Sequence, residues 1–296
     1  MSRTRPRPTR LRPIGVLAAA LLTAAACATT EAPKSSGTQQ RPCPVDQPSS
    51  ATAAAAGTVS AHARLTVMAD TITAIPADTR TSAAYPYSAV HTQQWSITGD
   101  TVEARDVVIW RAADGTARTQ TRTLTLHRDP ARFSDRAERQ RLATAPAQIV
   151  DYPLANGARL DGVITEPVTH DPRALAEALA AQHGALCRRP GLFDRYLQLA
   201  GGFYLDQQAR TATLRLLATI PDLAFDGIAR DLIGRPGWVF VLTRPGQHTT
   251  DTIVIDPATG VLLAAATAEV DARHPRHITL YLERGRTTTR DQPPSP

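Results

Sequence analysis

The C-terminal part of the chain alternates apolar and polar residues in five consecutive segments between residues 223 and 285. Gly and Pro residues stand between the segments, which read LAFDGIARDLIG, GWVFVLTRPG, TTDTIVIDPATG, VLLAAATAEV and HITLYLERG. A period of two is typical of half-buried strands, and the turn residues favour antiparallel pairing. The pattern therefore predicts a sheet that the rest of the chain must cover.

The preceding part of the chain predicts helices and one further hairpin. An apolar stripe at steps of three and four, ended by Pro76, predicts a first helix and consists of Leu65, Met68, Ile72 and Ile75. Further helices are expected at 172–184, 192–199 and 205–219, a strand at 85–97, and a hairpin at 106–129 around Asp114–Gly115. Residues 130–172 are ambiguous, with a charged segment at 135–145 that favours a surface helix.

Helices and antiparallel strands in separate blocks define an α+β fold. We expect a curved, half-barrel-like antiparallel sheet with helices packed on its concave face. One folded domain over residues 58–285 accommodates these elements, because about 230 residues suffice for one sizeable core.

The first 26 residues have the organisation of an export signal. Arginines and no acidic residue precede an apolar run from Ile14 to Ala26. A membrane-spanning helix needs about 20 apolar residues, so the run is short for a permanent span. We expect a cleaved signal peptide over residues 1–26, with a buried core helix as the alternative.

The exit of this segment, Ala24-Ala25-Ala26-Cys27, resembles the lipobox of bacterial lipoproteins. The resemblance implies a diacylglycerol on the thiol of Cys27 and cleavage before it, and two acyl chains suffice for stable anchoring. We therefore expect a lipid anchor on the outer face of the cell membrane. Ala24 stands where lipoboxes usually have Leu, and ordinary cleavage after Ala26, giving a secreted protein, is the alternative.

Most of the basic charge belongs to the leader. The whole chain has a formal net charge of +6, and removing the five leader arginines lowers it to +1. A nearly neutral mature chain lacks the electrostatic footprint of a nucleic-acid-binding protein. Residues 27–57 and 286–296 are rich in Pro, Ser, Thr and Gln and poor in large apolar residues, so we expect a disordered tether and a disordered tail.

The motif IDPATGVLL contains Asp256, Pro257 and Gly260. The carboxylate can accept backbone N–H groups, proline sets φ, and glycine permits a positive φ. The motif therefore predicts a structural turn between two strands. The alternative, a catalytic aspartate, would need a partner base or a metal that the sequence does not show.

No zinc, calcium, phosphate-loop or nucleophile-elbow motif occurs. His274 and His277 are three residues apart near a strand, and this spacing points their side chains to opposite faces. We accordingly expect no catalytic residue, no metal and no cofactor. If Cys27 is acylated, Cys43 and Cys187 remain, and in an exported chain they could form a disulfide or stay as two free thiols.

The segments LFDRYLQLAGGFYLDQQARTATLRLLATIPDL, GRPGWVFVLTR and DTIVIDPATGVLL lie within residues 174–269. They resemble a family of actinobacterial exported or membrane-anchored proteins to which no activity is assigned, and whose members are often associated with extracytoplasmic sigma-factor systems. The family is also remotely similar in layout to LolA-like and RseB-like half-barrels, which hold lipid or lipoprotein against a curved sheet. The resemblance implies no catalytic residues.

These observations predict a non-enzymatic cell-envelope lipoprotein that binds or senses a lipid, a lipopeptide or a protein partner, and no nucleic acid. A secreted or surface-anchored hydrolase is one alternative, which requires Ser, His and carboxylate side chains in one cleft. A structural accessory of an envelope sigma-factor system is the other.

Overall fold

The computed structural model describes residues 60–75, 84–127, 136–152, 168–181, 189–244, 248–272, 274–291 and 294. All of them belong to one compact unit, Val45–Pro296. The expected leader, the lipid attachment at Cys27 and the disulfide between Cys43 and Cys187 lie outside the described residues.

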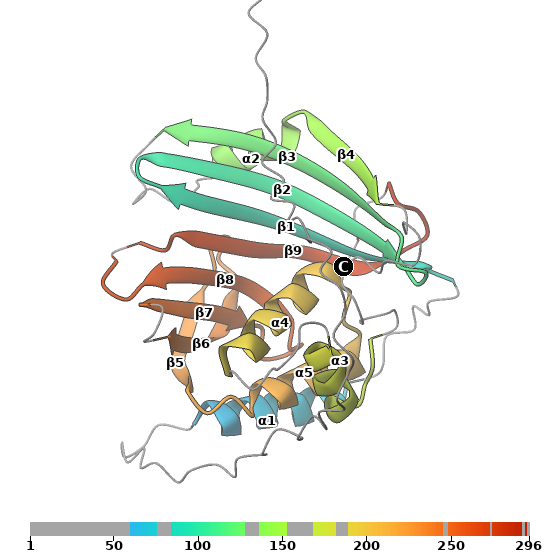
Figure 1. Cartoon of the computed structure of the whole chain (residues 1–296), viewed down its shortest axis with the longest axis vertical. Helices are drawn as coiled ribbons and strands as arrows, with labels where there is room; N and C mark the ends of the chain where they lie inside the picture. Colours follow the sequence, from blue (N-terminus) through green and yellow to red (C-terminus); the bar gives the residue numbers. More distant parts are fainter. Residues whose placement is uncertain are drawn as a thin grey trace, which may run out of the picture. The chain divides into compact units, whose positions relative to one another are not determined.

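Nine antiparallel strands form one open sheet in the order β4-β3-β2-β1-β9-β8-β7-β6-β5 (Figure 1). The strands are β1 (Tyr87–Thr98), β2 (Thr101–Ala112), β3 (Ala117–His127), β4 (Ala147–Tyr152), β5 (Leu223–Arg230), β6 (Pro236–Arg244), β7 (Thr249–Ile255), β8 (Leu262–Glu269) and β9 (His277–Thr287). The order joins two meanders, β1–β4 and β5–β9, through the pairing of β1 with β9. The first and the last strand of the chain therefore meet inside the sheet.

The hairpins form where the turn residues predict them. Between β2 and β3, the Asp114 carboxylate accepts hydrogen bonds from the amide and the hydroxyl of Thr116, and Gly115 has a φ of 87°. Such a positive φ favours glycine, and an aspartate that accepts from a residue two positions on stabilises the turn.

Helices cover both faces of the sheet. Neighbouring residues of a strand point to opposite faces, and in β8 Ala265 belongs to the main core whereas Ala264 belongs to the second one. The main core contains residues of α1 (Ala61–Thr73), α3 (Pro172–Ala181), α4 (Arg189–Gly202) and α5 (Gln207–Leu217), and the second contains Leu142 of α2 (Arg136–Thr144). We call these two surfaces the four-helix face and the α2 face.

Bulges interrupt the strand pairing near the middle of the sheet. Leu263 of β8 and Leu282 of β9 have no partner in the registers with β7 and β1. A bulge adds a residue to one strand and bends it. The pairing between β8 and β9 covers only four residues on each strand, Ala264–Thr267 and His277–Leu280.

Arginine side chains hold the two strands together where this pairing stops. Arg284 donates to the carbonyl of Leu262 (2.9 Å), and Arg235 donates to the carbonyls of Leu263 (3.0 Å) and Tyr281 (2.8 Å). These guanidinium groups donate hydrogen bonds to backbone carbonyls that lie beyond the last paired residues of β8 and β9. Burial lowers the pKa of Arg284 to about 10, so its guanidinium is still charged at neutral pH.

The expected α+β class, with an open antiparallel sheet and packed helices, is confirmed. Several details differ from the expectation: strand β4 forms within residues 130–172, which the sequence left ambiguous, and β2 begins at Thr101 and not at 106. Helix α2 lies on the face opposite to the other helices, β9 continues to Thr287 beyond the expected domain limit, and Ile75 is 42% exposed because α1 ends at Thr73.

A candidate binding groove between α4 and the sheet

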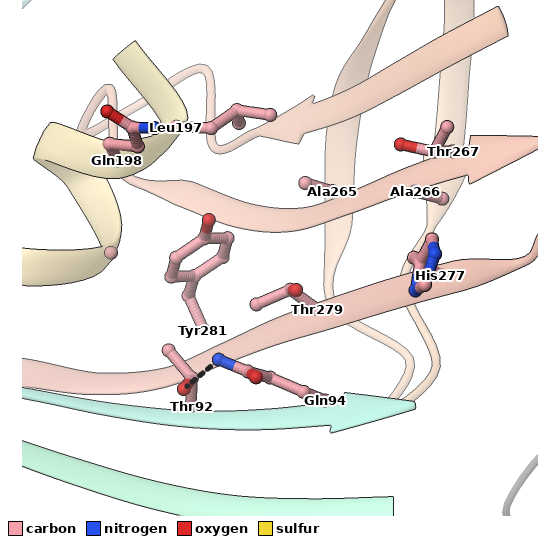
Figure 2. Close-up of a pocket in the computed structure, with 11 residues that line it drawn as sticks. Thr92, Gln94, Leu197, Gln198, Ala265, Ala266, Thr267, His277, Thr279 and Tyr281 are labelled. Atoms are coloured by element: carbon pink, nitrogen blue, oxygen red, sulfur yellow. Dashed lines mark hydrogen bonds between the residues drawn. The ribbon is translucent and has the colours of Figure 1, made fainter. Parts of the chain in front are cut away.

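A groove of about 270 Å³ opens between α4 and the four-helix face of the sheet (Figure 2). Strands β1, β8 and β9 form its floor and α4 forms its wall. The lining residues are Thr92, Gln94, Leu197, Gln198, Gly201, Ala265, Ala266, Thr267, His277, Thr279 and Tyr281. The groove therefore lies where the two meanders join.

Small side chains keep this space open. A Cβ atom on Gly201 would lie 3.9 Å from the Tyr281 ring, at ordinary contact distance. On the floor, Ala265, Thr267 and Thr279 leave room that larger residues would fill. Gly201 is the penultimate residue of α4, and its missing side chain leaves the space next to the Tyr281 ring open.

No Asp, Glu, Lys or Arg occurs among the residues just named, and His277 is the one basic side chain in the lining. Burial raises the pKa of Tyr281 to about 12, so its phenol remains protonated at neutral pH. Gln94 donates a hydrogen bond to the Thr92 hydroxyl (3.3 Å) within the groove. The arrangement suits an apolar chain that carries a few neutral hydrogen-bonding groups.

A serine and a histidine meet beside the groove. His277 lines it, and its Nδ1 atom lies 3.2 Å from Oγ of exposed Ser96. Within the part of the chain that the structure describes, no hydrogen bond or ion pair joins His277 to a carboxylate. The geometry thus supplies two components of a nucleophilic triad.

A chain of polar contacts fixes the α4 wall to the floor. Arg244 of β6 donates to both carboxylate oxygens of Asp194 in α4 (2.9 and 2.5 Å) and lies 2.5 Å from the carboxylate of Asp251 in β7. Asp251 accepts from the hydroxyl of Thr267 (2.7 Å), which lines the groove. The hydrogen bond to Asp194 raises the pKa of Arg244 further, so this cation is permanent.

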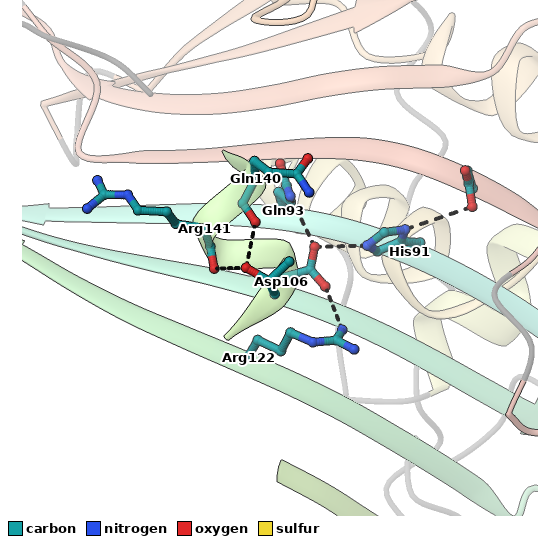
Figure 3. Close-up of polar contacts among 8 residues, drawn as sticks. His91, Gln93, Asp106, Arg122, Gln140 and Arg141 are labelled. Atoms are coloured by element: carbon teal, nitrogen blue, oxygen red, sulfur yellow. Dashed lines mark hydrogen bonds and ion pairs between the residues drawn. The ribbon is translucent and has the colours of Figure 1, made fainter. Parts of the chain in front are cut away.

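A second polar cluster lies on the α2 face (Figure 3). Asp106 is 2% exposed and accepts from His91 (3.0 Å), Gln93 (3.0 Å) and Arg122 (3.2 Å). Burial acts to raise the pKa of Asp106, but the hydrogen bonds from His91 and Gln93 and the nearby positive charges together lower it. Since its carboxylate is fully engaged by strand neighbours, the cluster has the character of a structural network.

Asp256, Pro257 and Gly260 lie in the turn between β7 and β8. The Asp256 carboxylate accepts from the amide of Ala258 (2.9 Å) and the hydroxyl of Thr259 (2.7 Å), and Gly260 has a φ of 68°. The carbonyl of Thr259 also accepts from Arg210 of α5 (2.9 Å). The turn is therefore attached to the helices as well as to the strands it connects.

The two histidines singled out by sequence occupy different elements. His277 begins β9, and His274 precedes that strand in the connection from β8. Across the described ranges, no group of three His, Cys, Asp or Glu side chains is arranged to hold a metal ion.

The groove itself was not identified from the sequence. The Gly201–Gly202 pair gave no signal, because it falls between the helices expected at 192–199 and 205–219, and in the structure it ends α4. The polar link through Arg244 had no signal in the sequence either. Asp194 precedes Arg244 by 50 positions in the chain, and Asp251 belongs to a different strand.

Fold and groove together define an α+β protein with an open nine-stranded antiparallel sheet and a groove between α4 and strands β1, β8 and β9. No family model and no curated protein matches the chain. Similar solved structures include MucB in complex with MucA(peri), with a TM-score of 0.34 at 14% identity, and the Pseudomonas aeruginosa MucA/MucB complex, with 0.34 at 16%. MucB alone gives a TM-score of 0.32 at 14% identity.

These alignments cover 77–79% of this chain and 58–61% of the MucB chains, so the chain spans about three-fifths of their length. A likeness this weak carries no conclusion about the layout or the function of this chain. The resemblance to actinobacterial proteins stays a prediction. None of the described helices is long and apolar enough to cross a membrane.

Proposed function

We propose that the protein is a non-enzymatic accessory of the cell envelope that binds an uncharged, apolar chain of a partner molecule in the groove between α4 and the sheet. The single observation that supports this proposal is the neutral lining of a preformed groove. Burying an unpaired charge there would cost far more than burying an acyl chain or an apolar peptide.

The envelope location rests on the leader and on the expected lipid at Cys27. The partner class rests on the sequence resemblance to proteins associated with extracytoplasmic sigma-factor systems. MucB was crystallised with MucA(peri), and by analogy alone we propose a protein of an envelope signalling system as the molecule that carries the chain. A lipid or a lipopeptide presents the same apolar chemistry.

Native mass spectrometry of the protein purified from its own envelope tests the proposal. A bound lipid adds a few hundred daltons with acyl-chain spacing, whereas a protein partner adds a polypeptide mass. Either species supports binding in the groove if substituting a lining residue removes it. A protein that carries neither, and acquires neither when mixed with envelope extract, contradicts the proposal.

Hydrolysis is the second candidate, and the contact between Ser96 and His277 favours it. A serine hydrolase would require this pair to react with an acyl group in the groove. Labelling with a fluorophosphonate, followed by the Ser96→Ala variant, distinguishes the two functions. Labelling that disappears in Ser96→Ala supports hydrolysis, and an unlabelled protein supports binding without catalysis.

A further inference from the structure

The floor of the groove changes in burial from one end to the other. At its inner end, Thr92 is 3% exposed and Tyr281 is 4% exposed, and the two residues lie opposite each other in the register of β1 and β9 (Figure 2). At its outer end, Ser96 and His277 also lie opposite each other, and both are exposed. The pair of residues between these two is half-buried. A ligand in the groove therefore has one end shielded from water and the other end in contact with it.

The inner end is suited to an apolar group. Leu197 and Gly201 of α4 belong to the lining, and the space that Gly201 leaves open faces the Tyr281 ring. The Thr92 hydroxyl is engaged within the floor, because it accepts a hydrogen bond from Gln94 (3.3 Å). Apolar surface that a ligand buries at this end is removed from water, which favours binding.

The outer end presents a hydrogen-bond donor to a ligand. Nδ1 of His277 lies 3.2 Å from Oγ of Ser96, and the tautomer of the ring decides which of the two atoms donates. If Ser96 donates, the Nε2–H group of His277 remains as a donor. If the Nδ1–H group of His277 donates, the hydroxyl hydrogen of Ser96 remains. In both tautomers the pair thus keeps one donor for an acceptor on the ligand.

Charged side chains close to His277 in the sheet are paired with each other. Arg276, which precedes His277, forms an ion pair of 2.9 Å with Glu269 at the end of β8. Thr267 lies opposite His277 in β8 and donates its hydroxyl to Asp251 (2.7 Å). Because these groups already have partners, an uncharged acceptor matches the outer end better than an anion does.

We propose that the ligand is a single acyl chain joined to its head group by an ester, with its methyl end against Tyr281 and its ester carbonyl at His277 and Ser96. The inference rests on the proposed function, since it assumes that the groove holds an apolar chain. The carbonyl is an uncharged hydrogen-bond acceptor, and its contact with the exposed pair fixes the direction in which the chain enters. The head group beyond the ester then lies in water.

Calorimetric titration with two matched probes tests the contact with the carbonyl. Monodecanoylglycerol carries an ester, and decyl glyceryl ether has the same chain length and head group without the carbonyl. We expect the ester to bind the wild type about fivefold more tightly, the size of one net hydrogen bond. The double variant Ser96→Ala with His277→Phe should bind both probes without this preference. Thr98→Val, at an exposed residue of the same strand, is the matched control and should keep it.

The outcomes separate this inference from the proposed function. If the wild type binds both probes equally, the inference is overturned and the proposed function stands. A preference for the ester that persists in the double variant overturns the inference as well, because the carbonyl then contacts other groups. If the wild type binds neither probe, both the inference and the proposed function are contradicted.

Nuclear Overhauser effects between the bound ester and the wild type give the direction of the chain without any variant. The terminal methyl group should show contacts with the ring of Tyr281, and the glycerol protons should show contacts with the ring of His277. The reverse pattern, or contacts of the methyl group with both rings, overturns the proposed direction.

Discussion

At the scale of single residues, Asp106 is the clearest case of a buried charge that the fold has to satisfy. Asp106→Asn preserves the shape of the side chain but removes the charge that His91 and Arg122 face. Hydrogen bonds to charged groups contribute about 1.5–3 kcal/mol, so we expect a loss of that order in the free energy of unfolding. Urea denaturation measures it, and Asp100→Asn at an exposed turn should change stability little.

The lowered pKa of Asp106 also sets the pH at which this contribution disappears. A carboxylate whose pKa is lower in the folded state contributes its full stability above its unfolded pKa, about 3.9, and loses it as pH falls through the folded value. The difference between wild type and Asp106→Asn should therefore be larger at neutral pH than below about pH 4. A difference that persists unchanged in acid would contradict this assignment.

Gly260 is constrained both by its backbone conformation and by the side chains that surround it. Its φ of 68° disfavours any side chain, and a Cβ there would collide with Ile72 of α1 and come within 3.0 Å of Leu214 of α5. Gly234 has a φ of 87°, and a Cβ on it would meet nothing within 4 Å, so Gly234→Ala isolates the backbone cost. We expect Gly260→Ala to destabilise by about 1–3 kcal/mol more than Gly234→Ala, the usual cost of overpacking. Equal losses in thermal denaturation would refute the packing role of the turn.

At the scale of elements, Arg244 connects α4 with β6 and β7. Arg244→Met removes the cation and leaves Asp251, which is 4% exposed, without its counter-charge. Breaking a buried pair in this way costs about 3–5 kcal/mol, and because Asp194 is half-exposed we expect the lower end. Replacing both residues, as Arg244→Met with Asp251→Leu, should recover part of the loss. Hydrogen exchange should show faster opening of α4 in both variants than in the wild type, because each loses the contact between Arg244 and Asp194.

Most of the helices and strands could be predicted from the sequence. Period-two segments and turn residues predicted strands at β5 to β9 and the β2–β3 hairpin, and steps of three and four predicted α1 through Leu65, Met68 and Ile72. The position of α2 could not be predicted, because a charged helix shows which residues it exposes and not which face of a sheet it covers. Leu142 alone forms its apolar contact with the second core.

At the scale of the whole molecule, the groove results from long-range placement that no local pattern encodes. Its floor joins β1 with β9, almost 200 positions apart in the chain, and Thr92 lies opposite Tyr281 in that register. The sequence could indicate a sheet with helices on its concave face, but the side chains that meet there depend on bulges at Leu263 and Leu282. Arg235 and Arg284 contact the backbone where β8 and β9 stop pairing, and these contacts depend on the same bulges.

Native mass spectrometry of a groove-filling variant decides whether this groove holds an apolar chain. Gly201→Leu places a side chain in the groove, because Gly201 lines it and a Cβ there would already lie 3.9 Å from the Tyr281 ring. Glu177→Leu, at a solvent-exposed residue of α3, is the matched control. We expect bound lipid or partner on the wild type and on Glu177→Leu, and its loss from Gly201→Leu. Equal occupancy of Gly201→Leu and the wild type, or an empty wild type, would contradict it.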